Sequence, residues 1–303
     1  MQQKKDILIT GSVAIDSIKT PFGEAVEVLG GSATYASFTA SLFSPVKVIS
    51  VVGSDFPERY LQKFTERNID ISGLKISQGQ TFRWTGFYEE NMNEAQTVSV
   101  CPENLKDRFL EIPAHYKDIG YLFLANTDPD VQSEILESIN VSGPVLLDTM
   151  NLWITNKRDS LKKLLGKVDI VLINETEAKM VTGKVNLICA AREIARMGPE
   201  TVVIKKGEHG AFLFREGEIF CVPAYPVEEV KDPTGAGDTF AGGFTGYLAY
   251  CGETNSTALR QAAITGAAVA SFAVEDFSTK KIESMTFADI ENRVQQIKNM
   301  LKL

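Results

Sequence analysis

Residues 170–205 read IVLINETEAKMVTGKVNLICAAREIARMGPETVVIK. The stretch opens and closes on short apolar runs, at 170–173 and 202–205, and the segments between them repeat apolar side chains at helical spacing. A strand, a helical connection and a second strand in this order predict two parallel strands joined by a crossover. This unit decides the fold class, because the same alternation continues on both sides of it.

The alternation covers most of the chain. Further apolar runs that we expect to form strands lie at residues 7–10, 46–52, 121–125 and 145–147. Segments with helical spacing lie at residues 33–42, 56–68, 130–139, 160–165, 175–181 and 187–197. We therefore predict an α/β fold with a mostly parallel central sheet covered by helices on both faces.

Two segments interrupt this pattern with alternating, strand-like residues, at about 16–28 and 81–100. We expect them to form a small antiparallel β lid over a cleft, because insertions at the edge of a rigid sheet carry moving parts. The alternative is an ordinary edge hairpin packed on the core. No Pro/Gly/Ser-rich linker divides the chain, so we expect residues 1–303 to form a single domain with a discontinuous lid.

Composition limits the function. The 303 residues are 44% hydrophobic, and 31 Lys and Arg against 39 Asp and Glu give a net charge of −8. This charge opposes broad binding to nucleic acid or anionic membranes, so a polyanionic ligand needs a local binding device. Two histidines exclude a three-histidine metal site. Four cysteines without a CxxC pair, and no apolar signal or membrane-spanning segment, lead us to expect a cytoplasmic protein.

Residues 232–240, DPTGAGDTF, supply such a device. Two glycines let the backbone turn so that N–H groups converge, and the helix that follows offers its positive end to an anion. The stretch is neither a Walker P-loop nor GxGxxG. Asp238 stands where a carboxylate beside the loop would take the proton of an attacking hydroxyl. The alternative is that Asp238 only complements the helix dipole.

The 232–240 stretch closely resembles the C-terminal signature of the ribokinase-like (PfkB) carbohydrate kinases. Weaker motifs of that family follow in its order along the chain. They are GSVAID at 11–16, the diglycine Gly30–Gly31, NETE at 174–177 and VIKKG at 203–207. The resemblance implies a three-layer α/β/α kinase domain that uses ATP and Mg²⁺.

It also implies roles for individual residues. Asp238 would be the general base and the backbone of Gly235, Ala236 and Gly237 the anion hole. The other residues that the resemblance assigns are Asp16, Gly30, Gly31 and Tyr35 for substrate, Asn174, Lys205, Gly207, Gly235 and Gly237 for nucleotide, and Glu177 for the outer shell of Mg²⁺. Asp232 and Thr234 match the family's positions for a monovalent cation, which makes K⁺ a further candidate cofactor.

Most of these motifs have a second interpretation that is purely structural. Asp16 alone is typical of a turn or a cap, and Gly30–Gly31 of the turn before a helix. Asn174 and Glu177 have the form of a capping box, which is compatible with a functional role. Gly207 alone is typical of a hairpin turn. The order of the motifs carries the inference more than any single one of them.

Substrate choice is where the sequence departs from the family. Many members have an Asn at the position of Tyr35, and ribose-specific members have a Lys at that of Ser32, so a specific ribokinase is disfavoured. Alternation in the lid places Phe82 and Trp84 on one face, where they stack on a sugar or nucleobase or else bury the lid. Arg83, on the other face, would pair with an acidic substrate.

We expect an ATP-dependent kinase that phosphorylates a hydroxyl of a small sugar or sugar-like molecule. The alternatives are a nucleoside kinase of the same family and a non-catalytic sugar- or nucleotide-binding regulator. A dinucleotide-dependent oxidoreductase is disfavoured. Its glycine-rich fingerprint would follow the first strand, where residues 11–14 contain only one glycine, Gly11. An apolar lid face would be covered by a second copy, so we also expect a homodimer.

Overall fold

The computed structural model describes residues 5–92, 95–101 and 111–302. Residues 93 and 94, within the segment 81–100 expected to form part of the lid, lie outside the described residues. The strands are β1 (Ile7–Thr10), β2 (Ala14–Thr20), β3 (Gly23–Gly30), β4 (Val46–Gly53), β5 (Asp70–Ser77), β6 (Arg83–Tyr88), β7 (Ala95–Cys101), β8 (Asp118–Ile119), β9 (Tyr121–Leu124), β10 (Asn140–Val141), β11 (Val145–Asp148), β12 (Ile170–Asn174), β13 (Thr201–Lys205), β14 (Ala211–Arg215) and β15 (Glu218–Val222). The helices are α1 (Ser32–Ala40), α2 (Glu58–Glu66), α3 (Pro129–Ser138), α4 (Asn151–Asn156), α5 (Arg158–Leu165), α6 (Glu175–Thr182), α7 (Leu187–Ala195), α8 (Ala236–Cys251), α9 (Ser256–Ala273), α10 (Lys280–Ser284) and α11 (Phe287–Met300), with 3₁₀ turns η1 (Ala114–Tyr116) and η2 (Gly207–His209).

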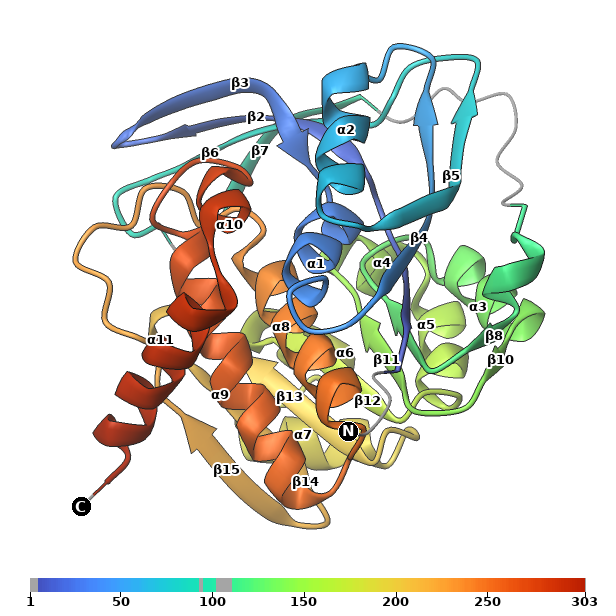
Figure 1. Cartoon of the computed structure of the whole chain (residues 1–303). Coiled ribbons are helices and arrows are strands. Elements are labelled where there is room, and N and C mark those ends of the chain that lie inside the picture. The colour runs from blue at the N-terminus through green and yellow to red at the C-terminus, as the bar shows by residue number, and fades with distance from the viewer. Residues whose placement is uncertain (1–4, 93–94, 102–110, 303) are drawn as a thin grey trace.

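Nine strands form the central sheet in the order β15-β14-β13-β12-β11-β9-β1-β4-β5 (Figure 1). Neighbours from β13 to β5 run parallel, whereas β14 and β15 add an antiparallel edge. The fold class predicted from the alternating pattern is therefore confirmed. The carboxyl ends of the parallel strands share one edge of the sheet, which is where ligands bind in folds of this kind.

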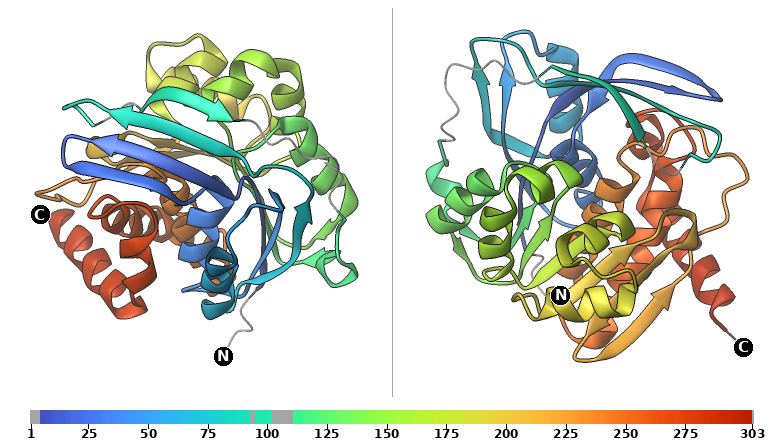
Figure 2. Two further views of the ribbon diagram at one scale, coloured as in Figure 1. Left: turned by 90° about the horizontal axis from the view of Figure 1, so that it is seen from above. Right: turned by 180° about the vertical axis from the view of Figure 1, so that it is seen from behind.

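Helices cover both faces of this sheet. Successive side chains of a central strand point to opposite faces, and each face packs against helices in a hydrophobic core of its own. Ile7 and Ile9 of β1 pack with α1, α8 and α9, whereas Leu8 between them packs with α3, α5, α6 and α7. Figure 2 shows this second set in front of the sheet when the molecule is seen from behind. The strands thus form the middle of three layers.

A separate four-stranded sheet, the small sheet, has the order β3-β2-β6-β7 and lies above the central sheet in Figure 1. Its two hairpins are antiparallel, but β2 and β6, which join them, run parallel. The expected all-antiparallel lid was wrong at this junction. The reason is topological, because both hairpins leave the central sheet in the same direction.

In the described part of the chain, every helix is too short or too polar to cross a lipid bilayer.

Candidate active site

The loop before α8 is shaped by two glycines with different neighbours. Gly235 adopts a left-handed conformation with φ 74°, and a Cβ there would lie 2.4 Å from the ring of Tyr35. A Cβ on Gly237 would lie 3.3 Å from the Lys205 Nζ. Both glycines are therefore closely packed. Gly235 lies against the ring of Tyr35, and Gly237 lies against the ammonium group of Lys205.

The first turn of α8 presents backbone donors at this loop. The N–H groups of a helix's first turn have no acceptor within the helix, and the helix dipole makes them attractive to anions. Ala236 N–H donates to the Pro233 carbonyl at 3.2 Å, and Thr239 N–H donates to the Gly235 carbonyl at 2.8 Å. The N–H groups of Gly237 and Asp238, between them in the turn, are thus the natural donors to an anion.

Asp238 occupies the same first turn and is partly buried. Desolvation and, to a lesser extent, the charge of Asp148 raise the pKa of its carboxyl to about 7, against the opposing charge of Lys205. A carboxyl with a pKa near neutrality, next to an anion-binding turn, is suited to accept a proton from a hydroxyl.

Polar residues stand at the ends of three adjacent parallel strands, β11, β12 and β13. Asp148 and Lys205 form an ion pair, with Nζ and Oδ2 2.6 Å apart and side chains only 4% and 14% exposed. Asn174 begins α6 with a complete capping box, in which Glu177 Oε2 accepts the Asn174 N–H and Asn174 Oδ1 accepts the Glu177 N–H, both at 2.8 Å. The capping interpretation of this motif is therefore confirmed.

The buried carboxyl groups of Asp148 and Glu177 lie around one lysine, Lys205, and their charges affect one another. Burial and the nearby Asp148 charge raise the pKa of Glu177 to about 8. Burial alone would lower the pKa of Lys205, but the carboxylates of Asp148 and Glu177 raise it above its usual value. Lys205 is thus held as an ammonium ion, and a further cation would stabilise the carboxylates.

Asp16, the candidate substrate ligand on β2, is buried against the diglycine. A Cβ on Gly30 would lie 1.9 Å from Asp16 Oδ2, so a glycine is needed for this side chain to lie where it does. Gly31 has φ 96°, and a Cβ there would lie 2.4 Å from the Ser12 carbonyl oxygen. Burial, together with the charges of Asp232 and Asp238, raises the pKa of Asp16 to about 7.

The small sheet contributes aromatic side chains next to these acids. Trp84 is the register partner of Asp16 across the parallel β2–β6 pair, and its Nε1 donates to Thr97 Oγ1 at 3.2 Å. Thr234 Oγ1 donates to the hydroxyl of Tyr88 at 3.2 Å. Phe82 precedes β6 and is partly buried. Tyr88 was not among the predicted substrate-binding residues, although it continues the alternation of Phe82 and Trp84.

Arg83 does not lie free for an acidic ligand. Its guanidinium pairs with Asp55 at 2.6 Å and with Glu27 at 3.4 Å, which joins both hairpins of the small sheet to the central domain. The expected contact of Arg83 with an acidic substrate therefore has a competitor on the protein itself.

Asp232 anchors the loop to the segment after α9. Asp232 is buried, its Oδ1 accepts the Thr234 N–H at 2.9 Å, and its Oδ2 accepts the Ser278 N–H at 3.0 Å.

Gly207 lies in η2 after β13 with φ 54°, and its carbonyl accepts the Gly210 N–H within the same turn.

The structure thus brings most of the candidate residues into two neighbouring groups. Lys205, Glu177, Asp238 and Gly237 surround the start of α8, and Asp16, Tyr35, Asp232 and Gly235 lie beside it, since their charges or side chains interact. Asp148 was missed. Its signal was a polar residue directly after an apolar run, the position that Asn174 and Lys205 also occupy.

Known proteins resemble the chain over nearly its full length. Cytidine kinase of Thermococcus kodakarensis is 33% identical over 253 residues, 79% of this chain and 87% of that protein. Ribokinase of Haemophilus influenzae is 39% identical over 266 residues, 80% of this chain and 84% of that protein. The crystal structure of fructokinase from Vibrio cholerae with bound fructose, ADP and calcium superposes with a TM-score of 0.78 over 96% of this chain and 99% of that chain, at 19% identity.

The fold is therefore the ribokinase-like one that the motifs predicted. The sequence pattern of the pfkB carbohydrate kinases matches residues 4–284. Because this match includes both groups of candidate residues, the chain belongs to the pfkB family of carbohydrate kinases.

Proposed function

We propose that the protein transfers the γ-phosphoryl group of ATP to a hydroxyl of a small sugar or sugar-like molecule. The observation that carries this proposal is the placement of Asp238, whose carboxyl with its raised pKa lies in the first turn of α8 beside the Lys205 ammonium. Phosphoryl transfer needs an aligned acceptor and stabilised charge more than covalent help, and this arrangement offers both.

In the proposed mechanism, Asp16 binds one hydroxyl of the acceptor while Asp238 accepts the proton of the attacking one. The backbone N–H groups of Gly235, Ala236 and Gly237, together with that of Asp238, hold the oxygens of the transferred group. The Ala236 N–H already donates to Pro233 in the free protein, so the loop must release this bond if all four groups are to donate together. Oxyanion donors of this kind contribute about 3 kcal/mol each to transition-state stabilisation.

The residues present fit a magnesium ion delivered with the nucleotide. Among residues 5–92, 95–101 and 111–302, no three His, Cys, Asp or Glu side chains are grouped to hold a metal alone. Carboxylates such as Glu177 are the ligands Mg²⁺ prefers, directly or through waters, and a cation there would offset the like charges of Asp148 and Asp238 that act on Glu177. Bound Mg²⁺ would neutralise phosphate charge; Glu177 and Asn174 would orient its waters.

The monovalent cation expected at Asp232 and Thr234 would share Asp232 oxygens that already accept two backbone N–H groups. Potassium activation stays a prediction.

A nucleoside kinase is the second candidate. The relative from Thermococcus kodakarensis is a cytidine kinase, and Trp84 and Tyr88 form an aromatic surface beside Asp16 that suits a base attached to the sugar. A panel of ribose, fructose, myo-inositol, cytidine, adenosine and inosine with ATP and Mg²⁺, assayed for ADP release, separates the two. Turnover of none of them would favour the non-catalytic regulator.

Replacing Asp238 tests the mechanism directly. We expect Asp238→Asn to fold and to lower kcat by at least about 100-fold, because the amide cannot accept the hydroxyl proton. Near-native turnover in this variant would remove Asp238 from the mechanism.

The pH profile of the wild-type enzyme provides the matching control. Because the base must be ionised and the pKa of Asp238 is raised to about 7, kcat/KM should rise as the pH increases through 7 and level off above it. Asp16 titrates in the same range, so only the part of the rise that Asp238→Asn abolishes belongs to Asp238.

A further inference from the structure

Lys205 is a largely buried cation at the centre of the acidic cluster. It is the last residue of β13, where it is the register partner of Asn174, and its Nζ lies 2.6 Å from Asp148 Oδ2. The carboxylates of Asp148, Glu177 and Asp238 all act on its charge. One lysine therefore faces three carboxylates from three different segments.

The ammonium group also borders the anion-binding turn. The Cβ position of Gly237 is 3.3 Å from Lys205 Nζ, whereas the other glycine of the loop, Gly235, borders the ring of Tyr35. An anion at the start of α8 would therefore have N–H donors of the helix on one side and the ammonium on the other. This is a second, independent feature beyond the helix terminus itself.

A contribution to stability does not by itself explain the buried ion pair of Asp148 and Lys205. Replacing a buried ion pair by packed apolar residues is often neutral or stabilising, because desolvation of the charges offsets their attraction. Asp148 and Lys205 also stand at the carboxyl ends of their strands, the edge where ligands bind, and away from the middle of the core. Asp148 and Lys205 therefore lie where residues that bind a ligand are expected.

We propose that Lys205 is a catalytic residue whose ammonium donates to a non-bridging oxygen of the transferred phosphoryl group, and that Asp148 is the positioning residue that holds it there. The inference rests on the proposed kinase function and deepens it. In the step, the bond from the acceptor oxygen to phosphorus forms and the bond from phosphorus to the leaving ADP oxygen breaks. The hydroxyl proton passes to Asp238, ADP keeps the bonding electron pair, and Lys205 keeps its three protons.

This assignment differs from a general nucleotide-binding role. A lysine that only binds ATP contributes equally to the ground state and the transition state, so its loss raises the KM for ATP and leaves kcat unchanged. A lysine that meets the charge of the transferred group acts in the transition state, so its loss lowers kcat.

The test compares Lys205→Met and Lys205→Arg with Lys63→Met, assayed at saturating ATP and acceptor. Lys63 pairs with Glu283 at the same 2.6 Å, on α2 outside the cluster, so it controls for the loss of a lysine–carboxylate pair. We expect Lys205→Met to lower kcat by about 100-fold or more with a KM for ATP within about threefold, and Lys63→Met to leave both unchanged. Lys205→Arg should recover part of kcat.

Chemical rescue and Asp148→Asn complete the design. Added methylammonium or ethylammonium should restore part of the kcat of Lys205→Ala in a saturable way, a response that a purely structural lysine would not give. Asp148→Asn should lower kcat with little change in KM. If Lys205→Met folds poorly, the rescue of Lys205→Ala decides.

Three results would overturn the proposal: wild-type kcat in Lys205→Met, an increase confined to the KM for ATP, or the absence of rescue. A wild-type protein without kinase activity on the whole panel would overturn the proposed function itself, which is a different result.

Discussion

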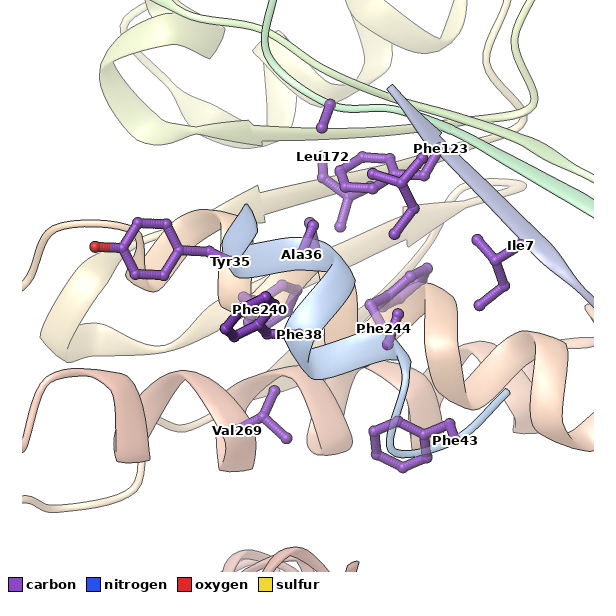
Figure 3. Close-up of a cluster of buried hydrophobic side chains, with 14 of the residues drawn as sticks. Ile7, Tyr35, Ala36, Phe38, Phe43, Phe123, Leu172, Phe240, Phe244 and Val269 are labelled. Atoms are coloured by element: carbon purple, nitrogen blue, oxygen red, sulfur yellow. The ribbon is translucent and has the colours of Figure 1, made fainter. Parts of the chain in front are cut away.

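Tyr35 is a buried residue with a polar atom left over. It is 1% exposed, its ring packs against Gly235, and its hydroxyl has no hydrogen-bond partner among the described residues. Figure 3 shows that hydroxyl pointing away from the apolar side chains of Phe38 and Phe240. Burial and the charges of Asp16, Asp232 and Asp238 raise its pKa well above the usual value, so the group stays neutral and able to donate. An unpaired buried hydroxyl costs about 1–3 kcal/mol, so we propose that a bound ligand supplies its partner.

We predict that Tyr35→Phe leaves the free protein as stable as the wild type or more stable, and raises the KM for the acceptor by about tenfold, because one hydrogen bond to the ligand is lost. Tyr121→Phe is the matched control. The Tyr121 hydroxyl donates to the Leu248 carbonyl at 3.1 Å, so its loss should cost about 1 kcal/mol of stability and leave the KM unchanged. Urea denaturation and steady-state kinetics measure both. An unchanged KM in Tyr35→Phe would show that the hydroxyl meets no substrate.

At this scale the sequence predicted the residues whose role depends on local spacing. Gly235 was identified because a positive φ before a helix needs a glycine, and the capping box of Asn174 and Glu177 because its partners are three residues apart. The Asp148–Lys205 pair was not, because 57 residues separate the two and their meeting depends on the strand order β11-β12-β13.

Helix α8 owes its place in the core to glycines on two of its sides. A Cβ on Gly242 would lie 2.4 Å from the Ala36 carbonyl oxygen of α1, and one on Gly243 would lie 2.3 Å from Val269 Cγ2 of α9. The first neighbour is a backbone atom, so α8 packs directly against the backbone of α1. The second is a side-chain carbon, so the Val269 side chain of α9 fills the space beside Gly243. The packing matters for the site, because α1 carries Tyr35 and α8 carries the anion-binding turn.

We predict that Gly242→Ala destabilises the fold by about 1–3 kcal/mol, because the new methyl group meets rigid backbone and must separate α1 from α8. Gly166→Ala, after α5, is the control. Its nearest neighbour would lie 3.4 Å away and its φ of −70° suits alanine, so its effect should stay within about 0.5 kcal/mol. Chemical denaturation measures the two. Equal stabilities would mean that α1 and α8 can separate without cost.

The contact between α8 and α1 could not be predicted from the sequence, because Ala36 lies about 200 residues before Gly242 in the chain. Strand β5 was missed for a related reason. It is an edge strand, DISGLKIS, in which mostly exposed and half-buried residues surround two small buried ones, and it lacks the continuous apolar run of the central strands.

On the scale of the whole molecule, a net charge of −8 has to be reconciled with a proposed substrate that carries several negative charges. The structure concentrates the compensating features at one sheet edge, where the α8 turn and Lys205 meet. The net negative charge of the whole chain leads us to expect that other polyanions bind poorly.

The small sheet exposes several apolar side chains, and these bear on the oligomeric state. Val26 and Val98 are 66% and 63% exposed, and with Phe87 they line a surface cavity of about 550 Å³ formed by β2, β3, β6 and β7. Small exposed sheets of this kind are usually covered, because their apolar side chains and edge groups favour association.

We therefore propose that a second copy of the chain covers this sheet, and we predict a dimer in light scattering of the purified protein. Val98→Lys should shift the mass to that of a monomer, because it places a charge in the apolar contact. Val185→Lys, at a valine before α7 that is 84% exposed, should leave the dimer intact. Both valines are exposed in the single chain, so neither change should lower its own stability by more than about 0.5 kcal/mol. A monomeric wild type over a wide range of concentrations would contradict the prediction. A dimer that persists in Val98→Lys would place the contact on another surface.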